Sequence, residues 1–319
     1  MLAFFLVFII SFVLAVMIGF PVLKLCKKLH LSQTILHYVD NHSGKSGTPT
    51  MGGWIFILSP LVALFFLKGN VWQGIFVLAI MLSYGLLGFL DDFIKIHFHK
   101  NEGLKPYQKI IGQVGIGLIV GFYRYFFVGS TLSLFGLEIN LSWGIIPFAV
   151  VFFVAITNSV NLTDGLDGLA GGVSFVYLLC FGVILALIGS FDNLALISFA
   201  CAGGVLGFLL FNGYPAKIFM GDTGSLALGG VIGALACFSR LELFVPILGV
   251  MFVASAVSDI LQVAYYKKTK KRIFKMAPLH HHFERCGVHE NRIVLAYVVI
   301  TLVCGLALIC GTMLFKGVL

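Results

Sequence analysis

Long apolar stretches without a charged side chain alternate with short polar connections along the chain. The uncharged stretches cover residues 1–23, 46–67, 69–90, 139–163, 168–191, 193–216 and 293–315. A helix needs about 20 apolar residues to cross the hydrocarbon core of a bilayer, whereas a membrane β-barrel shows alternating segments of about ten residues. The pattern therefore predicts an all-α polytopic membrane protein.

The sequence predicts about ten transmembrane helices. They cover about residues 2–23, 53–67, 71–91, 108–128, 144–160, 170–189, 194–211, 224–238, 243–265 and 293–315. The first lacks a basic start and a small-residue cleavage site, so it is expected to remain as a span. The ninth contains Asp259 and is a candidate for a broken helix. The whole chain, 1–319, is expected to form one domain.

Basic residues concentrate on one side of these helices. The alternate connections on that side are residues 24–52, 92–107, 161–169, 212–223 and 266–292. With Lys109 counted at their edge, they hold 17 of the 21 Lys and Arg and all nine His. The positive-inside rule makes this side cytoplasmic and places both termini outside. On the outer, periplasmic side, residues 131–141 alternate around Gly136 and predict a small β-hairpin.

The amino-acid composition supports a membrane protein and excludes a soluble domain. Hydrophobic residues make up 60% of the chain and charged residues 11%, whereas soluble domains average about 25% charged residues. The net charge of +8 follows from topology and offers anionic lipids a basic face, so no nucleic acid is needed to explain it. The seven cysteines show no paired spacing and indicate neither a disulfide framework nor a zinc site.

Two acidic clusters stand at the cytoplasmic ends of predicted spans. Asp91 and Asp92 end an apolar run, with Lys95 one turn further on. Asp164 and Asp167 are each followed by glycine, close to Asn161. Carboxylate and amide oxygens favour divalent cations. The alternatives are an interfacial anchor with an intrahelical ion pair for the first cluster and a helix cap for the second.

A third cluster, Gly221-Asp-Thr-Gly-Ser225, precedes a predicted helix. Backbone N–H groups at such a position suit an anion, and Asp222 suits a cation bridged to it. A plain N-cap is the alternative, and the spacing is not that of a Walker motif.

Two further segments complete the set. The basic run 267–275, which suits anchoring to anionic lipid, precedes His280, His281, His282 and Glu284. These histidines suit either a metal ion or phosphate groups. Lys45 and Thr50 lie in a glycine-rich segment. This segment suits either a phosphate-binding loop or a simple turn into a helix.

All five segments lie at the predicted cytoplasmic edge, where they can converge on one site. Acids for a divalent cation, glycine turns and basic groups together indicate phosphoryl-type chemistry. An apolar groove between spans would admit a lipid phosphate as one substrate.

The motifs also resemble those of a known superfamily. They are Asp91-Asp-Phe-Ile-Lys95, Asn161-Leu-Thr-Asp-Gly-Leu-Asp-Gly168, Gly221-Asp-Thr-Gly-Ser225 and Pro278-Leu-His-His-His-Phe-Glu284. They resemble the polyprenyl-phosphate N-acetylhexosamine-1-phosphate transferases. The histidine motif and Gly47-Thr-Pro-Thr-Met-Gly-Gly53 resemble the muramoyl-pentapeptide branch.

The resemblance implies an activity. Such an enzyme transfers phospho-MurNAc-pentapeptide from UDP-MurNAc-pentapeptide to undecaprenyl phosphate, giving lipid I and UMP in peptidoglycan synthesis. It implies Mg²⁺ as cofactor, the bacterial inner membrane as location and a homodimer as assembly. Direct attack by the lipid phosphate and a covalent aspartyl intermediate both remain open.

The resemblance also implies residue roles. The expected catalytic residues are Asp91, Asp92, Asp222 and His280, and the three aspartates are the expected metal ligands. The expected substrate-binding residues are Lys45, Thr50, Lys95, Asn161, Asp164, Asp167, Asn212, Phe219, His281 and His282.

Three other functions compete with this one. A sister transferase would use UDP-GlcNAc as donor. An ion-coupled secondary transporter would place its acids at the bilayer midplane between repeats, and no repeat is visible. An undecaprenyl-pyrophosphate phosphatase would need no uridine pocket, so inhibition by UMP separates it from a transferase.

Overall fold

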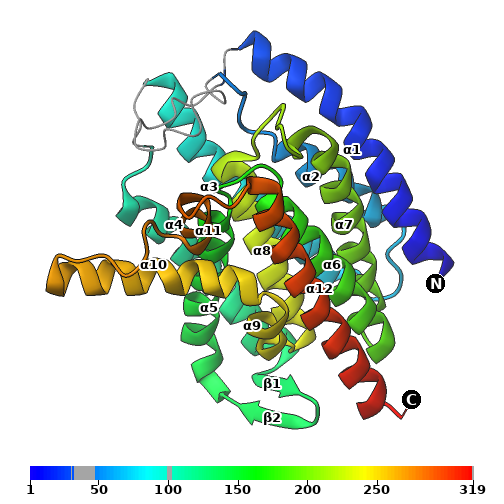
Figure 1. The fold of residues 1–319 in the computed structure, drawn as a ribbon. Coiled ribbons are helices and arrows are strands. Elements are labelled where there is room, and N and C mark those ends of the chain that lie inside the picture. The colour runs from blue at the N-terminus through cyan, green and yellow to red at the C-terminus, as the bar shows by residue number, and fades with distance from the viewer. Residues whose placement is uncertain (30, 32–46, 99–102, 318–319) are drawn as a thin grey trace.

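The computed structural model describes residues 1–29, 31, 47–98 and 103–317, which form a helical bundle (Figure 1). The α-helices are α1 (Leu2–Lys28), α2 (Trp54–Leu58), α3 (Trp72–His97), α4 (Pro106–Tyr123), α5 (Ile145–Thr163), α6 (Leu169–Ile188), α7 (Asp192–Asn212), α8 (Gly221–Ser239), α9 (Val245–Leu248), α10 (Val250–Thr269), α11 (Leu279–Arg285) and α12 (Glu290–Phe315). Short 3₁₀ segments cover Ser59–Phe65, Ser142–Gly144 and Glu242–Phe244, and a π-helical turn covers Arg124–Val128. The strands are β1 (Thr131–Leu134) and β2 (Leu137–Asn140).

The predicted class is confirmed, with a small difference in the number of spans. Within the described residues, eight helices are long and apolar enough to cross a membrane, and a bent pair makes a ninth. The expected span over 53–67 is instead the short helix Trp54–Phe65. At about 1.5–2 Å per residue, it reaches only about two thirds of the 30 Å hydrocarbon core.

The predicted break in the ninth span is also confirmed. The segments Glu242–Leu248 and Val250–Thr269 meet at an angle of 80°. Gly249 joins them, and its N–H donates to the carbonyl oxygen of Val245 at 2.8 Å. Beyond the break, α10 projects away from the bundle (Figure 1).

Helix α8 lies at the centre of the bundle, between α3 and α5. Glycines make these close approaches possible, because small residues let helix backbones pack directly on one another in a membrane. A Cβ on Gly229 of α8 would lie 2.5 Å from Cα of Thr157 on α5. A Cβ on Gly88 of α3 would overlap the backbone of Asp222 and Thr223. The chain thus brings the end of α3 against the first turn of α8.

The hairpin predicted over 131–141 is present. Thr131 pairs with Asn140 and Leu134 with Leu137 in antiparallel register. The two turn residues, Phe135 and Gly136, both have positive φ, as the tightest hairpin turns require. The hairpin lies beside the C-terminal end of α12 (Figure 1).

A buried ion pair ties the hairpin to the bundle. The side chains of Arg124 and Glu242 are both fully buried, with Nε of the arginine 3.2 Å from Oε1 of the glutamate. The same guanidinium donates to the carbonyl oxygens of Gly129 and Thr131. The side chain of Arg124 therefore links the end of α4 to the start of β1 and to the turn after α8.

Candidate functional site

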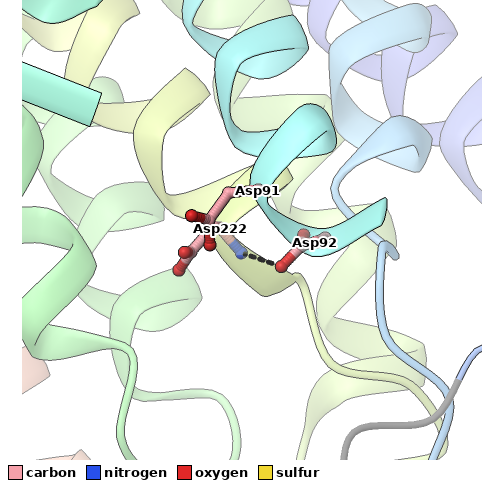
Figure 2. A group of neighbouring side chains, drawn as sticks. All are labelled: Asp91, Asp92 and Asp222. Carbon is pink, nitrogen blue, oxygen red and sulfur yellow. Dashed lines mark hydrogen bonds between the residues drawn. The ribbon is translucent and has the colours of Figure 1, made fainter. Parts of the chain in front are cut away.

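Three carboxylates meet where α3 ends and α8 begins. Asp91, Asp92 and Asp222 each offer one oxygen, and these atoms all lie within 4.8 Å of one another (Figure 2). Asp91 and Asp92 are buried, and Asp222 keeps some exposed surface. Such a set of hard oxygen donors is the kind that binds a divalent cation.

Asp92 caps the neighbouring helix. Its carboxylate accepts hydrogen bonds from the N–H of Asp222 at 3.2 Å and from the N–H of Thr223 at 2.9 Å. The hydroxyl of Thr223 donates a third bond at 2.7 Å. These contacts satisfy free N–H groups at the start of α8 and place a negative charge at the positive end of its dipole. Asp92 therefore fixes the backbone that carries Asp222.

Two lysines offset the charge of the acids. Nζ of Lys95 lies 2.6 Å from Asp91 Oδ2 and 2.9 Å from Asp222 Oδ2. Nζ of Lys109, on α4, lies 2.8 Å from Asp222 Oδ2 and 3.4 Å from Asp91 Oδ1. Buried carboxylates need such partners, since an unpaired buried charge costs several kcal/mol.

The sequence interpretation missed the role of Lys109. It counted this residue only as a charge at the edge of a loop. The available signal was a lysine within the predicted span 108–128, because a charge in such a position is expected to face a partner.

The end of α5 joins the same cluster. The side-chain amide of Asn161 donates to Asp222 Oδ1 at 2.7 Å and to the hydroxyl of Ser225 at 2.8 Å. Asp164 follows α5 directly. Burial, reinforced by the neighbouring carboxylates, raises the pKa of Asp164 to about 8. The loop after α5 thus extends the acidic site.

Gly221 leaves room for the acids and for Thr50. Its φ is +69°, and a Cβ there would lie 2.7 Å from Oγ1 of Thr50 and would overlap the carboxylate of Asp92. Thr50 is buried, and its N–H donates to the carbonyl oxygen of Leu31 at 2.7 Å. Thr50, one of the predicted residues, therefore lies beside the acidic cluster.

We expect Gly221→Ala to lower activity at least about tenfold, because the new methyl group displaces Asp92 from the first turn of α8. Gly69→Ala is the matched control, since Gly69 also has a positive φ, +64°, but nothing lies within 4 Å of its Cβ position. Rates of the UMP release that the sequence resemblance implies, measured on the two purified variants, make the comparison. Equal losses in both would show that backbone strain, and not the contact with Asp92, causes the effect.

A second group of predicted residues forms hydrogen bonds between the two loops beside the cluster. The side chain of Asn212 accepts from the N–H of Gly168 at 3.1 Å and donates to the carbonyl oxygen of Ile218 at 2.9 Å. Oδ2 of Asp167 accepts from the N–H of Ala216 at 2.9 Å. Asp167 and Asn212 therefore hold the 164–168 loop, the residues between α5 and α6, against residues 213–220.

Phe219 lies at the end of that second loop. Its N–H donates to Pro49 and its carbonyl oxygen accepts from Gly52, both at 2.8 Å. Its ring is half-buried. Phe219 therefore lies next to residues 49–52.

The three histidines of α11 contact different parts of the chain. A Cβ on Gly165 would overlap the ring of His280 and would lie 3.0 Å from Nε2 of His281, so both rings contact the 164–168 loop. His282 turns elsewhere, and its Nδ1 accepts from the N–H of Lys275 at 3.1 Å. Nδ1 of His281 lies 3.0 Å from Oε2 of Glu284.

His280 is fully buried, and neither ring nitrogen has a hydrogen-bond partner among the described residues. Burial, reinforced by His281, lowers the pKa of His280 to about 3. The ring is therefore neutral at physiological pH and suited to donate or accept one hydrogen bond from a ligand.

This shift predicts acid sensitivity. Between pH 6.5 and 3 the unfolded chain binds a proton at His280 that the folded chain does not, so the free energy of unfolding falls as pH falls. The loss reaches about 2 kcal/mol at pH 5. Thermal melts in detergent from pH 7.5 to 5 should show a smaller decline for His280→Gln than for the wild type. The exposed His97→Gln is the control, and a decline in His280→Gln equal to that of the wild type would contradict the assignment.

The predicted residues therefore fall into three neighbouring groups. Around the acids lie Asp91, Asp92, Asp222, Lys95, Asn161, Asp164 and Thr50. The loops hold Asp167, Asn212 and Phe219, and α11 holds His280, His281 and His282. The predicted Lys45 lies outside the described residues.

Comparisons with known proteins find similarity over most of the chain. The profile of the family described as Glycosyl transferase family 4 matches residues 72–240. A protein of Clostridioides difficile (strain 630) named phospho-N-acetylmuramoyl-pentapeptide-transferase is 42% identical over 301 residues, covering 92% of this chain and 93% of that protein. Proteins of the same name from Clostridium novyi (strain NT) and Thermoanaerobacter sp. (strain X514) are also 42% identical, covering 92% of this chain and 92% and 94% of their own lengths.

Proposed function

The chain belongs to glycosyl transferase family 4 and to its phospho-N-acetylmuramoyl-pentapeptide transferases, and we propose that it transfers phospho-MurNAc-pentapeptide from UDP-MurNAc-pentapeptide to undecaprenyl phosphate. The products are lipid I and UMP. The chain is a multi-pass protein of the bacterial inner membrane. The observation that carries the proposal is the cluster of three acids and two lysines within a chain so similar to named transferases.

The donor set of the cluster fits Mg²⁺, which prefers carboxylate oxygens. We assign Asp222 as the direct ligand. Asp92 belongs to the same group, but its oxygens already accept bonds from the first turn of α8, so its main role is to position Asp222. When bound, Mg²⁺ would offset charge on the pyrophosphate and on the leaving UMP.

The protein's own groups supply the rest of the reaction. Lys95 and Lys109 neutralise phosphate oxygens beside the acids. An oxygen of the lipid phosphate attacks the β-phosphorus of the donor, a P–O bond forms, and the bond to the UMP oxygen breaks. Asp91 accepts the proton of the lipid phosphate where that group is still protonated. A lipid phosphate is a competent nucleophile at neutral pH, so no covalent aspartyl intermediate is required.

The loops beside the acids suit the donor. Phe219 offers a half-buried ring for the uracil base. Asp167 and Asn212 shape the surrounding backbone, and Asn161 and Asp164 form the polar floor. We assign the remaining predicted residues to phosphate and sugar contacts: Lys45, Thr50, His280, His281 and His282.

Exposed residues of the protein suit contact with membrane lipids. The exposed basic residues 267–272, at the end of α10 and directly after it, suit anionic lipid headgroups. Exposed apolar side chains on the outer helices, such as Ile260 and Leu261 on α10, suit the bilayer interior. The homodimer stays a prediction of the resemblance.

Donor choice and metal dependence test this proposal. Purified protein with undecaprenyl phosphate and Mg²⁺ should release UMP from UDP-MurNAc-pentapeptide at least about a hundredfold faster than from UDP-GlcNAc, and EDTA should stop release until Mg²⁺ is restored. Preference for UDP-GlcNAc would move the protein to the sister transferases. Full activity in EDTA would remove the metal from the proposal.

A further inference from the structure

The start of α12 reaches into the loop that we assign to the nucleotide. Glu290 is the first residue of α12, and the residue is only 9% exposed. Its Oε1 accepts a hydrogen bond of 2.5 Å from the backbone N–H of Asp167, 123 residues away in the sequence. The N-terminal end of the helix dipole stabilises the negative charge of Glu290 in this nearly buried place.

Asp167 is therefore held from two directions. Its N–H bonds to Glu290 of α12, while its carboxylate bonds to the N–H of Ala216 in the loop after α7. The next residue, Gly168, bonds through its N–H to Asn212. Three separate elements thus fix two consecutive residues of the 164–168 loop.

Another residue of the same loop contacts the histidines. The rings of His280 and His281 lie against Gly165, where a Cβ has no room. Only residues 286–289 connect α11 to α12. The loop is therefore in contact with both α11 and the first residue of α12.

We propose that Glu290 is a positioning residue for donor binding, acting through the backbone of Asp167. The inference rests on the proposed function, which gives the 164–168 loop its role in holding the nucleotide. Glu290 acts as a hydrogen-bond acceptor, so glutamine, which keeps an acceptor oxygen, replaces it, and alanine does not. Its contribution lies in the binding of the donor and not in the phosphoryl step.

Two measurements on the full-length protein in detergent test this inference. The first is calorimetric binding of UMP together with the kinetics of UMP release. Glu290→Ala should weaken UMP binding and raise the KM for the donor about tenfold, with kcat within about threefold of wild type. Glu290→Gln should stay within about twofold, and Arg292→Gln, an exposed change in the same helical turn, should match wild type.

The second measurement is hydrogen exchange of the amides of residues 164–172. Exchange should be faster in Glu290→Ala and unchanged in Glu290→Gln. Unchanged exchange in Glu290→Ala, equal defects in both variants, or a loss of kcat alone would overturn the positioning role. Failure of the wild type to bind UMP would instead refute the proposed function, whatever the exchange result.

Discussion

Asp222→Asn should lower the rate of UMP release by at least about a thousandfold while the protein remains folded. The carboxylate of Asp222 is the meeting point of Lys95, Lys109 and Asn161. Asparagine keeps a side-chain oxygen for these donors but loses the charge that a divalent cation requires. Initial rates with saturating substrates and Mg²⁺, measured on purified protein, check the size of the loss.

The control is Asp192→Asn, which removes the same charge from an exposed position at the start of α7. It should keep wild-type activity. Melting temperatures of both variants in detergent should lie close to that of the wild type. If Asp222→Asn releases UMP at a rate near wild type, Asp222 has no role in holding the metal.

Arg124→Met should destabilise the protein by about 3–5 kcal/mol, because it leaves the carboxylate of Glu242 buried without its partner. It also removes the donors to the carbonyl oxygens of Gly129 and Thr131. Denaturant unfolding in detergent micelles, followed by circular dichroism, measures the change.

The double variant Arg124→Met/Glu242→Leu should recover much of the lost stability, since no isolated charge then remains buried. Arg272→Met, at an exposed position, controls for loss of an arginine. Losses that simply add in the double variant would show that the two side chains act independently. The ion pair would then not be what holds the hairpin against the bundle.

Apolar run length predicted most of the fold correctly. The long helices, the break in the ninth span and the hairpin around Gly136 all follow from local pattern and are present. The segment 53–67 was expected to be a full-length span and forms only the shorter apolar helix Trp54–Phe65. Composition could not reveal this, because Ser59 and Pro60 begin a 3₁₀ segment inside an apolar run.

The charged residues of the site could be predicted from the sequence, whereas the contacts made through backbone groups could not. Asp91, Asp92 and Asp222 stood out because acids beside apolar runs need cations. Glu290 gave no such signal, because a glutamate at a helix start is an ordinary stabilising feature. Its partner is a backbone N–H far away in the sequence. Only the three-dimensional structure reveals a contact of this kind.

The central claim is that the acidic cluster transfers a phospho-sugar to a lipid phosphate. The most direct measurement is mass spectrometry of the lipid and nucleotide products after incubation of purified protein with UDP-MurNAc-pentapeptide, undecaprenyl phosphate and Mg²⁺. We predict one undecaprenyl-pyrophosphoryl-MurNAc-pentapeptide for each UMP, and neither product without the lipid phosphate. UMP formed without the lipid product, or no turnover by folded protein, would contradict the account.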